Sequence, residues 1–142
     1  MKIYVASSWR NLLQQYVVYA LREAGHDVYD FRNPAPGDHG FGWRQCAEKH
    51  ELTDPKLFRD NVLAHPVAQA AFAKDMTALQ AAEATVLVLP CGRSAHLELG
   101  YATGAGQRTV VLLDDPITEP ELMYLMNSNI CTSITEVVEL LK

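Results

Sequence analysis

The stretch ATVLVLPCGRSAHLELGYATGAGQRTVVLL, residues 84–113, decides the fold. The apolar runs at 84–90 and 108–113 are typical of strands buried on both faces. Between them, a polar Gly/Arg/Ser/His turn leads into a predicted helix over 95–106. Two strands joined by a helix form a β-α-β unit, and its right-handed crossover makes the strands parallel.

The same alternation extends toward both ends of the chain. KIYVAS (2–7) and HDVYDF (26–31) are predicted strands, joined by a helix that Ser8 caps and Gly25 ends. Further elements are predicted at 67–83 (helix), 118–126 (helix), 129–133 (short edge segment) and 134–142 (terminal helix). We therefore expect one doubly wound, flavodoxin-like parallel sheet with helices on both faces, in a single domain 1–142.

Residues 32–66 interrupt this rhythm with a Gly- and Pro-rich stretch. Short helices are predicted within it at about 43–50 and 55–63. Long excursions in compact domains are usually lids or binding loops. The aromatic residues Phe31, Phe41 and Trp43, with Arg32 beside them, favour a lid-like insertion that stacks on a flat ligand. A mobile surface insertion is the alternative.

Composition limits the class of partner. The chain has 142 residues, 49% of them hydrophobic, and a net charge of −5, which argues against nucleic-acid polymers and acidic membranes as partners. No secretory leader or apolar run of about 20 residues is visible, so we expect a cytoplasmic protein. The histidines and the three cysteines show no metal-ligand spacing, so no metal is expected. A thiol nucleophile at Cys91 is a minor alternative to reduced, buried thiols.

Two loops are expected to form a ligand crevice. In open α/β sheets, ligands bind beyond the carboxyl ends of the strands, where the strand order reverses. The loops SSWRN (7–11) and CGRSAH (91–96) both lead into helix N-termini, which favour anions. Candidate binding residues are Ser7, Ser8, Arg10, Arg93 and Ser94, with helix capping by the serines as the alternative. Trp9, Phe41 and Trp43 are candidates for stacking on a flat ligand.

Two acidic residues fall on predicted apolar helix faces. Asp75 lies in the stripe Phe72, Met76 and Leu79, and Glu98 lies with Tyr101, Ala102 and Ala105. An unpaired buried charge is costly, so each acid is either paired structurally or used in chemistry. Two carboxylates at the carboxyl end of one sheet favour catalysis. They suit glycosyl transfer, in which one attacks an oxocarbenium-like centre and the other assists.

Three segments resemble the nucleoside 2-deoxyribosyltransferase-like superfamily, which includes nucleoside deoxyribosyltransferases and nucleoside 5'-monophosphate N-glycosidases. They are KIYVASSWRN (2–11), FAKDMTALQAAEATVLVLP (72–90) and GRSAHLELGYATGAG (92–106). The similarity covers roughly 1–30 and 67–142, and 32–66 matches nothing in the family. Its most specific part is the ELGYA element after the Gly/Ser turn.

The resemblance implies roles for individual residues. Glu98 corresponds to the nucleophile, Asp75 to the aspartate that orients the sugar, and Tyr4 to a tyrosine near the nucleophile. Ser8 and Arg10 correspond to phosphate-binding residues of the monophosphate-cleaving branch. That branch has a serine six residues before the nucleophile, where this chain has Gly92, and His96 replaces a residue that is commonly small. Phosphate binding by Arg93 and Ser94 is then a hypothesis.

The implied activity is cleavage or transfer across the N-glycosidic bond of a (2'-deoxy)nucleoside or its 5'-monophosphate through a covalent glycosyl-Glu98 intermediate, without a cofactor. A homodimer or larger homo-oligomer is expected. The segment ELMYLMNSN (121–129) is either its contact or a core helix that buries Leu122, Met123 and Met126. Two alternatives stay open: a TIR-type NAD glycohydrolase, and a non-catalytic nucleotide-sensing module.

Overall fold

The computed structural model describes all residues from 1 to 142 and divides into two compact units. The first unit joins Met1–Asp30 to Leu79–Lys142, and the second is Phe31–Ala78. The predicted insertion at 32–66 lies wholly within the second unit. The two units are described separately below. No helix of either has the length and apolar character needed to cross a membrane.

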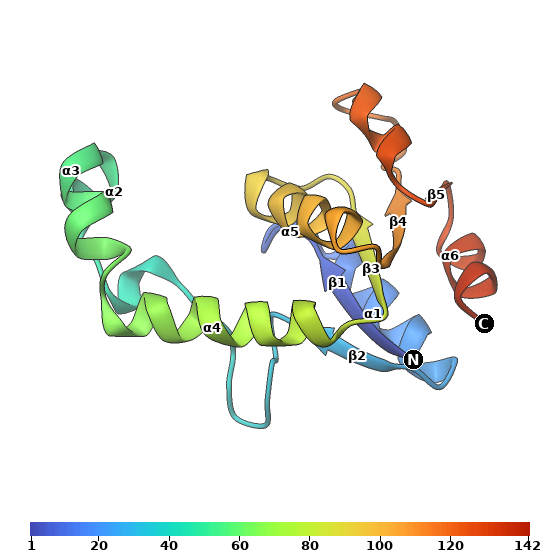
Figure 1. Cartoon of the computed structure of the whole chain (residues 1–142), viewed down its shortest axis with the longest axis horizontal. Helices are drawn as coiled ribbons and strands as arrows, with labels where there is room; N and C mark the ends of the chain where they lie inside the picture. Colours follow the sequence, from blue (N-terminus) through green and yellow to red (C-terminus); the bar gives the residue numbers. More distant parts are fainter. The chain divides into compact units, whose positions relative to one another are not determined.

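The first unit is built on a five-stranded parallel sheet with the order β2-β1-β3-β4-β5 (Figure 1). The strands are β1 (Lys2–Ala6), β2 (Asp27–Asp30), β3 (Ala84–Val88), β4 (Arg108–Leu112) and β5 (Asn129–Cys131). This is the flavodoxin-like order, which confirms the predicted fold class. From β1 the chain first adds β2 on one side of the sheet and then β3 on the other, so the strand order reverses between β1 and β3. The crevice expected of this fold therefore lies beyond the carboxyl ends of these two strands.

Alternating side chains of the strands face two different sets of helices. Ile3, Val5 and the matching residues of β3 and β4 form the main apolar cluster with α1 (Leu13–Glu23) and α6 (Ile134–Leu141). Successive side chains of a strand point to opposite faces, so Tyr4 and Thr85 face the other side. There, α5 (Arg93–Gly104) packs on β1, β3 and β4 (Figure 1). Helices therefore cover both faces, as predicted.

The helix starts in the first unit differ from the prediction. α1 begins at Leu13 rather than after Ser8, and the Leu13 amide donates to Asn11 Oδ1 at 3.0 Å. Ser8 does not cap this helix, because its hydroxyl oxygen accepts from the Gly92 amide at 2.8 Å. Ser94 does not cap α5 either, since that helix begins at Arg93 with Gly92 before it. Both predicted caps were wrong. Ser8 makes a long-range contact instead, and α5 begins before Ser94.

The predicted apolar stripes are also displaced. On α5 the buried residues are Ala95, Leu99 and Ala102, whereas Tyr101 is 40% exposed and Ala105 is also exposed. Glu98 is half-buried on the flank of that stripe. On α4 (Pro66–Ala81), Phe72 is 65% exposed and only Leu79 is fully buried. On α5 the offset is within about one residue's rotation, about 100°. On α4 the buried Leu79 belongs to the predicted stripe, but Phe72 on the same face is exposed.

The segment predicted as a helix over 118–126 contains only a short 3-10 turn, η3 (Leu122–Met126). Leu122, Met123 and Met126 are between 55% and 75% exposed, so the interpretation as a core helix was wrong. Tyr124 alone of this turn is buried. Tyr124 is therefore the side chain of this turn that packs against the rest of the unit.

The second unit consists of short helices and the larger part of α4. They are η1 (Trp43–Gln45), α2 (Lys49–Thr53), α3 (Pro55–Leu57) and η2 (Phe58–Val62), the last with π-helical hydrogen bonding. Phe41 and Phe58 meet Trp43 edge-on, with ring centroids 5.0 and 5.6 Å from it. Lys74 and Asp38 form an ion pair. Aromatic packing and this pair connect the short segments of the unit, in which Val62 is the one buried residue.

Candidate functional site

The centre of the candidate site is a hydrogen bond between β1 and α5. The Tyr4 hydroxyl donates to Glu98 Oε1 at 2.9 Å. Tyr4 is 1% exposed, because β1 is a central strand and this position faces α5. A neutral donor at this distance stabilises the ionised carboxylate and fixes its orientation. The sequence resemblance predicted that these two residues lie together, and they do.

Tyr29 belongs to the same cluster and was not predicted. Its ring stacks on the Tyr4 ring with centroids 5.3 Å apart and an interplanar angle of 18°. The two residues are register partners on β1 and β2, so parallel pairing places them side by side. The matching tyrosines in KIYVAS and HDVYDF were the signal available in the sequence. Stacking limits the movement of the Tyr4 ring and so of its hydroxyl.

The two loops predicted to converge do meet. Ser7 Oγ donates to the Val88 carbonyl at 2.8 Å, and Ser8 Oγ accepts from the Gly92 amide. Asn11, which was not predicted, is buried and its Nδ2 lies 3.2 Å from Ser7 Oγ and from the carbonyls of Val88 and Pro90. These bonds join the loops after β1 and β3 into one rigid edge at the strand-order reversal. Only the three-dimensional fold reveals this role of Asn11, since Val88 and Pro90 lie 77 and 79 residues away.

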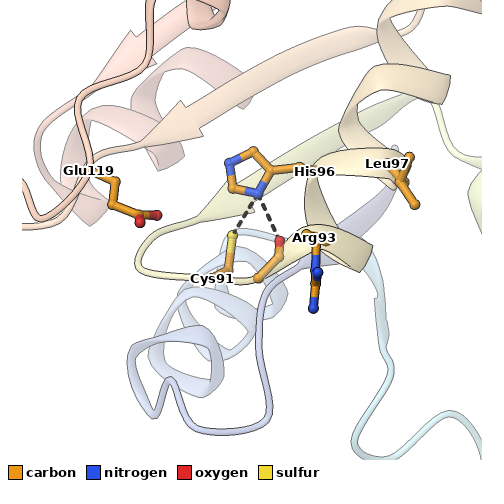
Figure 2. A pocket seen from close by; sticks show the side chains of 6 residues that line it. Cys91, Arg93, His96, Leu97 and Glu119 are labelled. Carbon is orange, nitrogen blue, oxygen red and sulfur yellow. Dashed lines mark hydrogen bonds between the residues drawn. The ribbon is translucent and has the colours of Figure 1, made fainter. Parts of the chain in front are cut away.

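A pocket of about 460 Å³ opens at the start of α5, lined by Cys91, Gly92, Arg93, His96, Leu97 and Glu119. Figure 2 shows the His96 imidazole turned toward Cys91, with Glu119 on another side of the pocket. His96 Nδ1 lies 2.8 Å from the Gly92 carbonyl oxygen and 3.7 Å from Cys91 Sγ. Its Nε2 lies 2.9 Å from the Tyr124 hydroxyl.

Cys91 is poorly suited to be a nucleophile. Burial, helped by the negative charges of Glu98 and Asp114, raises the pKa of its thiol from 9.0 to about 12. The thiolate is the reactive form, so the group is almost wholly unreactive at neutral pH. This argues against the thiol alternative and leaves the carboxylate of Glu98 as the candidate nucleophile of this unit.

The other predicted site residues lie on exposed or separate parts of the chain. Trp9 is 46% exposed, and Arg10, Arg93 and Ser94 are also exposed. Trp43 and Asp75 belong to the second unit, where Trp43 is 42% exposed within its aromatic cluster and Asp75 is half-buried on α4. No three His, Cys, Asp or Glu side chains gather to form a metal site. The roles of these residues stay predictions.

No family model matches the sequence, and neither does any curated protein. Solved structures do match. A 2-deoxyribosyltransferase from Bacillus psychrosaccharolyticus has a TM-score of 0.62 at 18% identity, over 97% of this chain and 90% of that one. A conserved protein from Enterococcus faecalis has 0.62 at 17% identity, over 98% and 95%. The CMP N-glycosidase of Clostridium botulinum has 0.52 at 14% identity, over 99% and 97%. The resemblance inferred from the sequence is confirmed at the level of the fold.

Proposed function

We propose that the protein cleaves or transfers across the N-glycosidic bond of a nucleoside or nucleoside 5'-monophosphate, with Glu98 as the nucleophile. The observation that carries this proposal is the Tyr4–Glu98 hydrogen bond at the strand-order reversal. It supports an oriented, half-buried carboxylate on α5, the helix that follows β3. Sheets of this kind bind ligands beyond the carboxyl ends of the strands at the order reversal. The shared fold with a 2-deoxyribosyltransferase and a CMP N-glycosidase supports the choice of bond.

The proposed reaction has two steps. A Glu98 oxygen attacks the anomeric carbon, a carbon–oxygen ester bond forms, and the carbon–nitrogen bond breaks with its electron pair leaving on the base. Water or a second base then attacks the same carbon and releases Glu98 as a carboxylate. The first outcome makes the protein a hydrolase and the second makes it a transferase.

The remaining residues have proposed binding roles. We assign Asp75 to orienting the sugar, and Arg10, Arg93 and Ser94 to the 5'-phosphate, because guanidinium groups pair well with phosphate oxygens. Ser7 and Ser8 hold the loop edge through their bonds to Val88 and Gly92. Stacking on the base is assigned to Trp9 and Trp43. The assignments of Asp75 and Arg10 rest on the sequence resemblance. Those of Arg93, Ser94, Trp9 and Trp43 rest on the exposure of their side chains.

Homo-oligomer formation is part of the proposal. The residues Leu122, Met123, Leu125 and Met126 of segment 121–129 are all more than half exposed, which is unusual for so compact an apolar group. We expect this segment to contact another copy of the chain. Light scattering of wild type and of Leu125→Glu tests it, and an unchanged molar mass in the variant contradicts it.

Base release measured by chromatography tests the central proposal. The substrates are nucleosides, their 5'-monophosphates and NAD, each with and without a second free base. Glu98→Gln keeps the shape of the side chain and removes its charge, so base release falls by more than about a thousandfold. A variant as active as wild type refutes the role of Glu98. Release from NAD alone supports the TIR-type alternative, and calorimetric binding without turnover supports a sensing module.

Gly92→Ser tests whether the substrate carries a phosphate. The Cβ of a residue at position 92 would lie 3.7 Å from Ser8 Oγ, an ordinary van der Waals contact, so the variant is expected to fold as wild type. It restores the serine of the monophosphate-cleaving branch. We therefore expect a lower KM for a 5'-monophosphate and an unchanged KM for the free nucleoside. Equal effects on both substrates contradict a phosphate at this turn.

A further inference from the structure

The pair His96–Tyr124 connects the first turn of α5 to η3, a distant part of the chain. Tyr124 is 7% exposed, whereas its neighbours Leu122, Met123, Leu125 and Met126 are between 55% and 75% exposed. Its ring stacks on the His96 imidazole, with centroids 5.8 Å apart and an angle of 20° between the planes. The one buried side chain of η3 is thus the one that reaches His96.

The hydrogen bonds determine which nitrogen of His96 carries a proton. A carbonyl oxygen only accepts, so Nδ1, 2.8 Å from the Gly92 oxygen, is the donor. In the neutral ring Nε2 is then the acceptor, and the Tyr124 hydroxyl donates to it at 2.9 Å. Burial raises the pKa of Tyr124 to about 12, so the hydroxyl keeps its proton at neutral pH. The result is a series of two hydrogen bonds, in which Tyr124 donates to His96 and His96 donates to Gly92.

Gly92 is held from both sides. Its carbonyl accepts from His96, and its amide donates to Ser8 Oγ on the loop after β1. Together with the first backbone hydrogen bond of α5, which the Gly92 carbonyl accepts as the N-cap residue, the two bonds fix the peptide groups on either side of Gly92. Tyr4 fixes Glu98 separately.

We infer that His96 and Tyr124 are positioning residues that hold the Cys91–Arg93 turn in the form that receives the substrate. The inference rests on the proposed function, and it assigns a role to the histidine that departs from the resembled family. Because Glu98 has its own anchor, loss of the pair weakens substrate binding more than it slows the chemistry. Loss of Tyr4 is expected to do the opposite.

Three variants test the inference. Tyr124→Phe keeps the stacked ring and removes the hydroxyl. His96→Phe keeps an aromatic ring and removes both hydrogen bonds. Thr103→Val is the control, because Thr103 Oγ1, which donates to the Leu99 carbonyl at 2.9 Å, also lies 3.2 Å from Asn127 Oδ1 and so contacts the same segment at the other end of α5. The control loosens the segment without touching the Gly92 turn.

The first measurement is amide hydrogen exchange at Gly92 by NMR. We expect exchange to rise about fivefold to tenfold in His96→Phe, the effect of one ordinary hydrogen bond, less in Tyr124→Phe, and not at all in Thr103→Val. Steady-state kinetics should show KM raised several-fold in the first two variants, with kcat within about twofold of wild type. The double variant His96→Phe/Tyr124→Phe should match His96→Phe alone, because both changes act through the same pair of hydrogen bonds.

Wild-type exchange at Gly92 in a folded His96→Phe overturns the inference, as does an equal rise in Thr103→Val. If His96→Phe does not fold, Tyr124→Phe decides by the same exchange measurement, since it loses only one hydroxyl. A kcat that falls as much as KM rises also overturns it. If wild type turns over no substrate, the proposed function fails, while the exchange data still decide whether the pair holds the turn.

Discussion

Substituting Tyr4→Phe should slow one step of the proposed reaction and leave the fold intact. The change removes a single hydroxyl that donates to Glu98 Oε1 at 2.9 Å. The ring stays in place, because it is 1% exposed and stacks on Tyr29. Glu98 changes charge during the reaction, so the effect on each step differs.

In the first step the Glu98 carboxylate loses negative charge as its ester forms, and a donor to it gives little help to the transition state. In the second step Glu98 leaves the sugar and regains its charge, so the bond from Tyr4 strengthens as the transition state is reached. A hydrogen bond to a charged group contributes about 1.5–3 kcal/mol. At about 1.36 kcal/mol per factor of ten, the second step should slow roughly 10- to 150-fold.

The glycosyl-enzyme ester should therefore accumulate in Tyr4→Phe. Quenched reactions analysed by intact-protein mass spectrometry measure the fraction of protein that carries the sugar, and a burst of base release gives the rates of both steps. Tyr16→Phe is the matched control, since Tyr16 is 67% exposed. Urea unfolding followed by circular dichroism checks that Tyr4→Phe is folded under assay conditions.

Two results would refute this reasoning. A folded Tyr4→Phe with kcat within twofold of wild type means that the bond does not act on the reaction. A slow first step without accumulated ester means that Tyr4 acts before the nucleophile attacks, for example by orienting Glu98 alone. The second result preserves Glu98 as nucleophile and removes only the assigned step.

Three further predictions concern stability and ionisation. Leu21→Ala, at a position with 0% exposure, should lower the free energy of unfolding by about 2–5 kcal/mol in urea, whereas Leu97→Ala, at 76% exposure, should change it by less than about 0.5 kcal/mol. Cys91, with its pKa raised from 9.0 to about 12, should react with iodoacetamide roughly a thousandfold more slowly than an ordinary thiol at pH 8, as peptide mass spectrometry would show; rapid labelling contradicts its burial. The Thr118 hydroxyl lowers the pKa of Asp114 below 3.8, so this bond stabilises the fold above that pH and is lost as the pH falls through the lower folded value; Thr118→Val should raise the pKa of Asp114 toward 3.8 in an NMR titration.

The sheet was predictable because its signal is local and strong. Each central strand is buried on both faces, so ATVLV at 84–88 appears in the sequence as an unbroken apolar run. The helices between the strands set the crossovers, and the handedness of the crossovers makes the strands parallel. The observed order β2-β1-β3-β4-β5 agrees with the flavodoxin-like class that was expected.

The contacts that shape the candidate site were less predictable. Ser8 was expected to cap the helix next to it, but its partner is the Gly92 amide, 84 residues away. Capping propensity considers only the backbone groups next to Ser8 in the sequence. In the structure the Ser8 hydroxyl instead accepts a tertiary hydrogen bond that joins the two loops. Asn11 and Tyr124 were missed for the same reason, since each bonds a residue far away in the sequence. Tyr29 had a signal, the matching tyrosines of the two predicted strands, that was not used.

The displacement of the stripe on α5 explains why Glu98 is suited to chemistry. A carboxylate at the centre of that stripe, where Leu99 is 4% exposed, would be sealed against the sheet and out of reach of a substrate. One residue earlier the helix turns about 100°, which places Glu98 on the flank, half-buried. There it reaches the Tyr4 hydroxyl on β1. The apolar residues Ala95, Leu99 and Ala102 hold the helix against the sheet, so the packing that excludes water also sets the position of the proposed nucleophile.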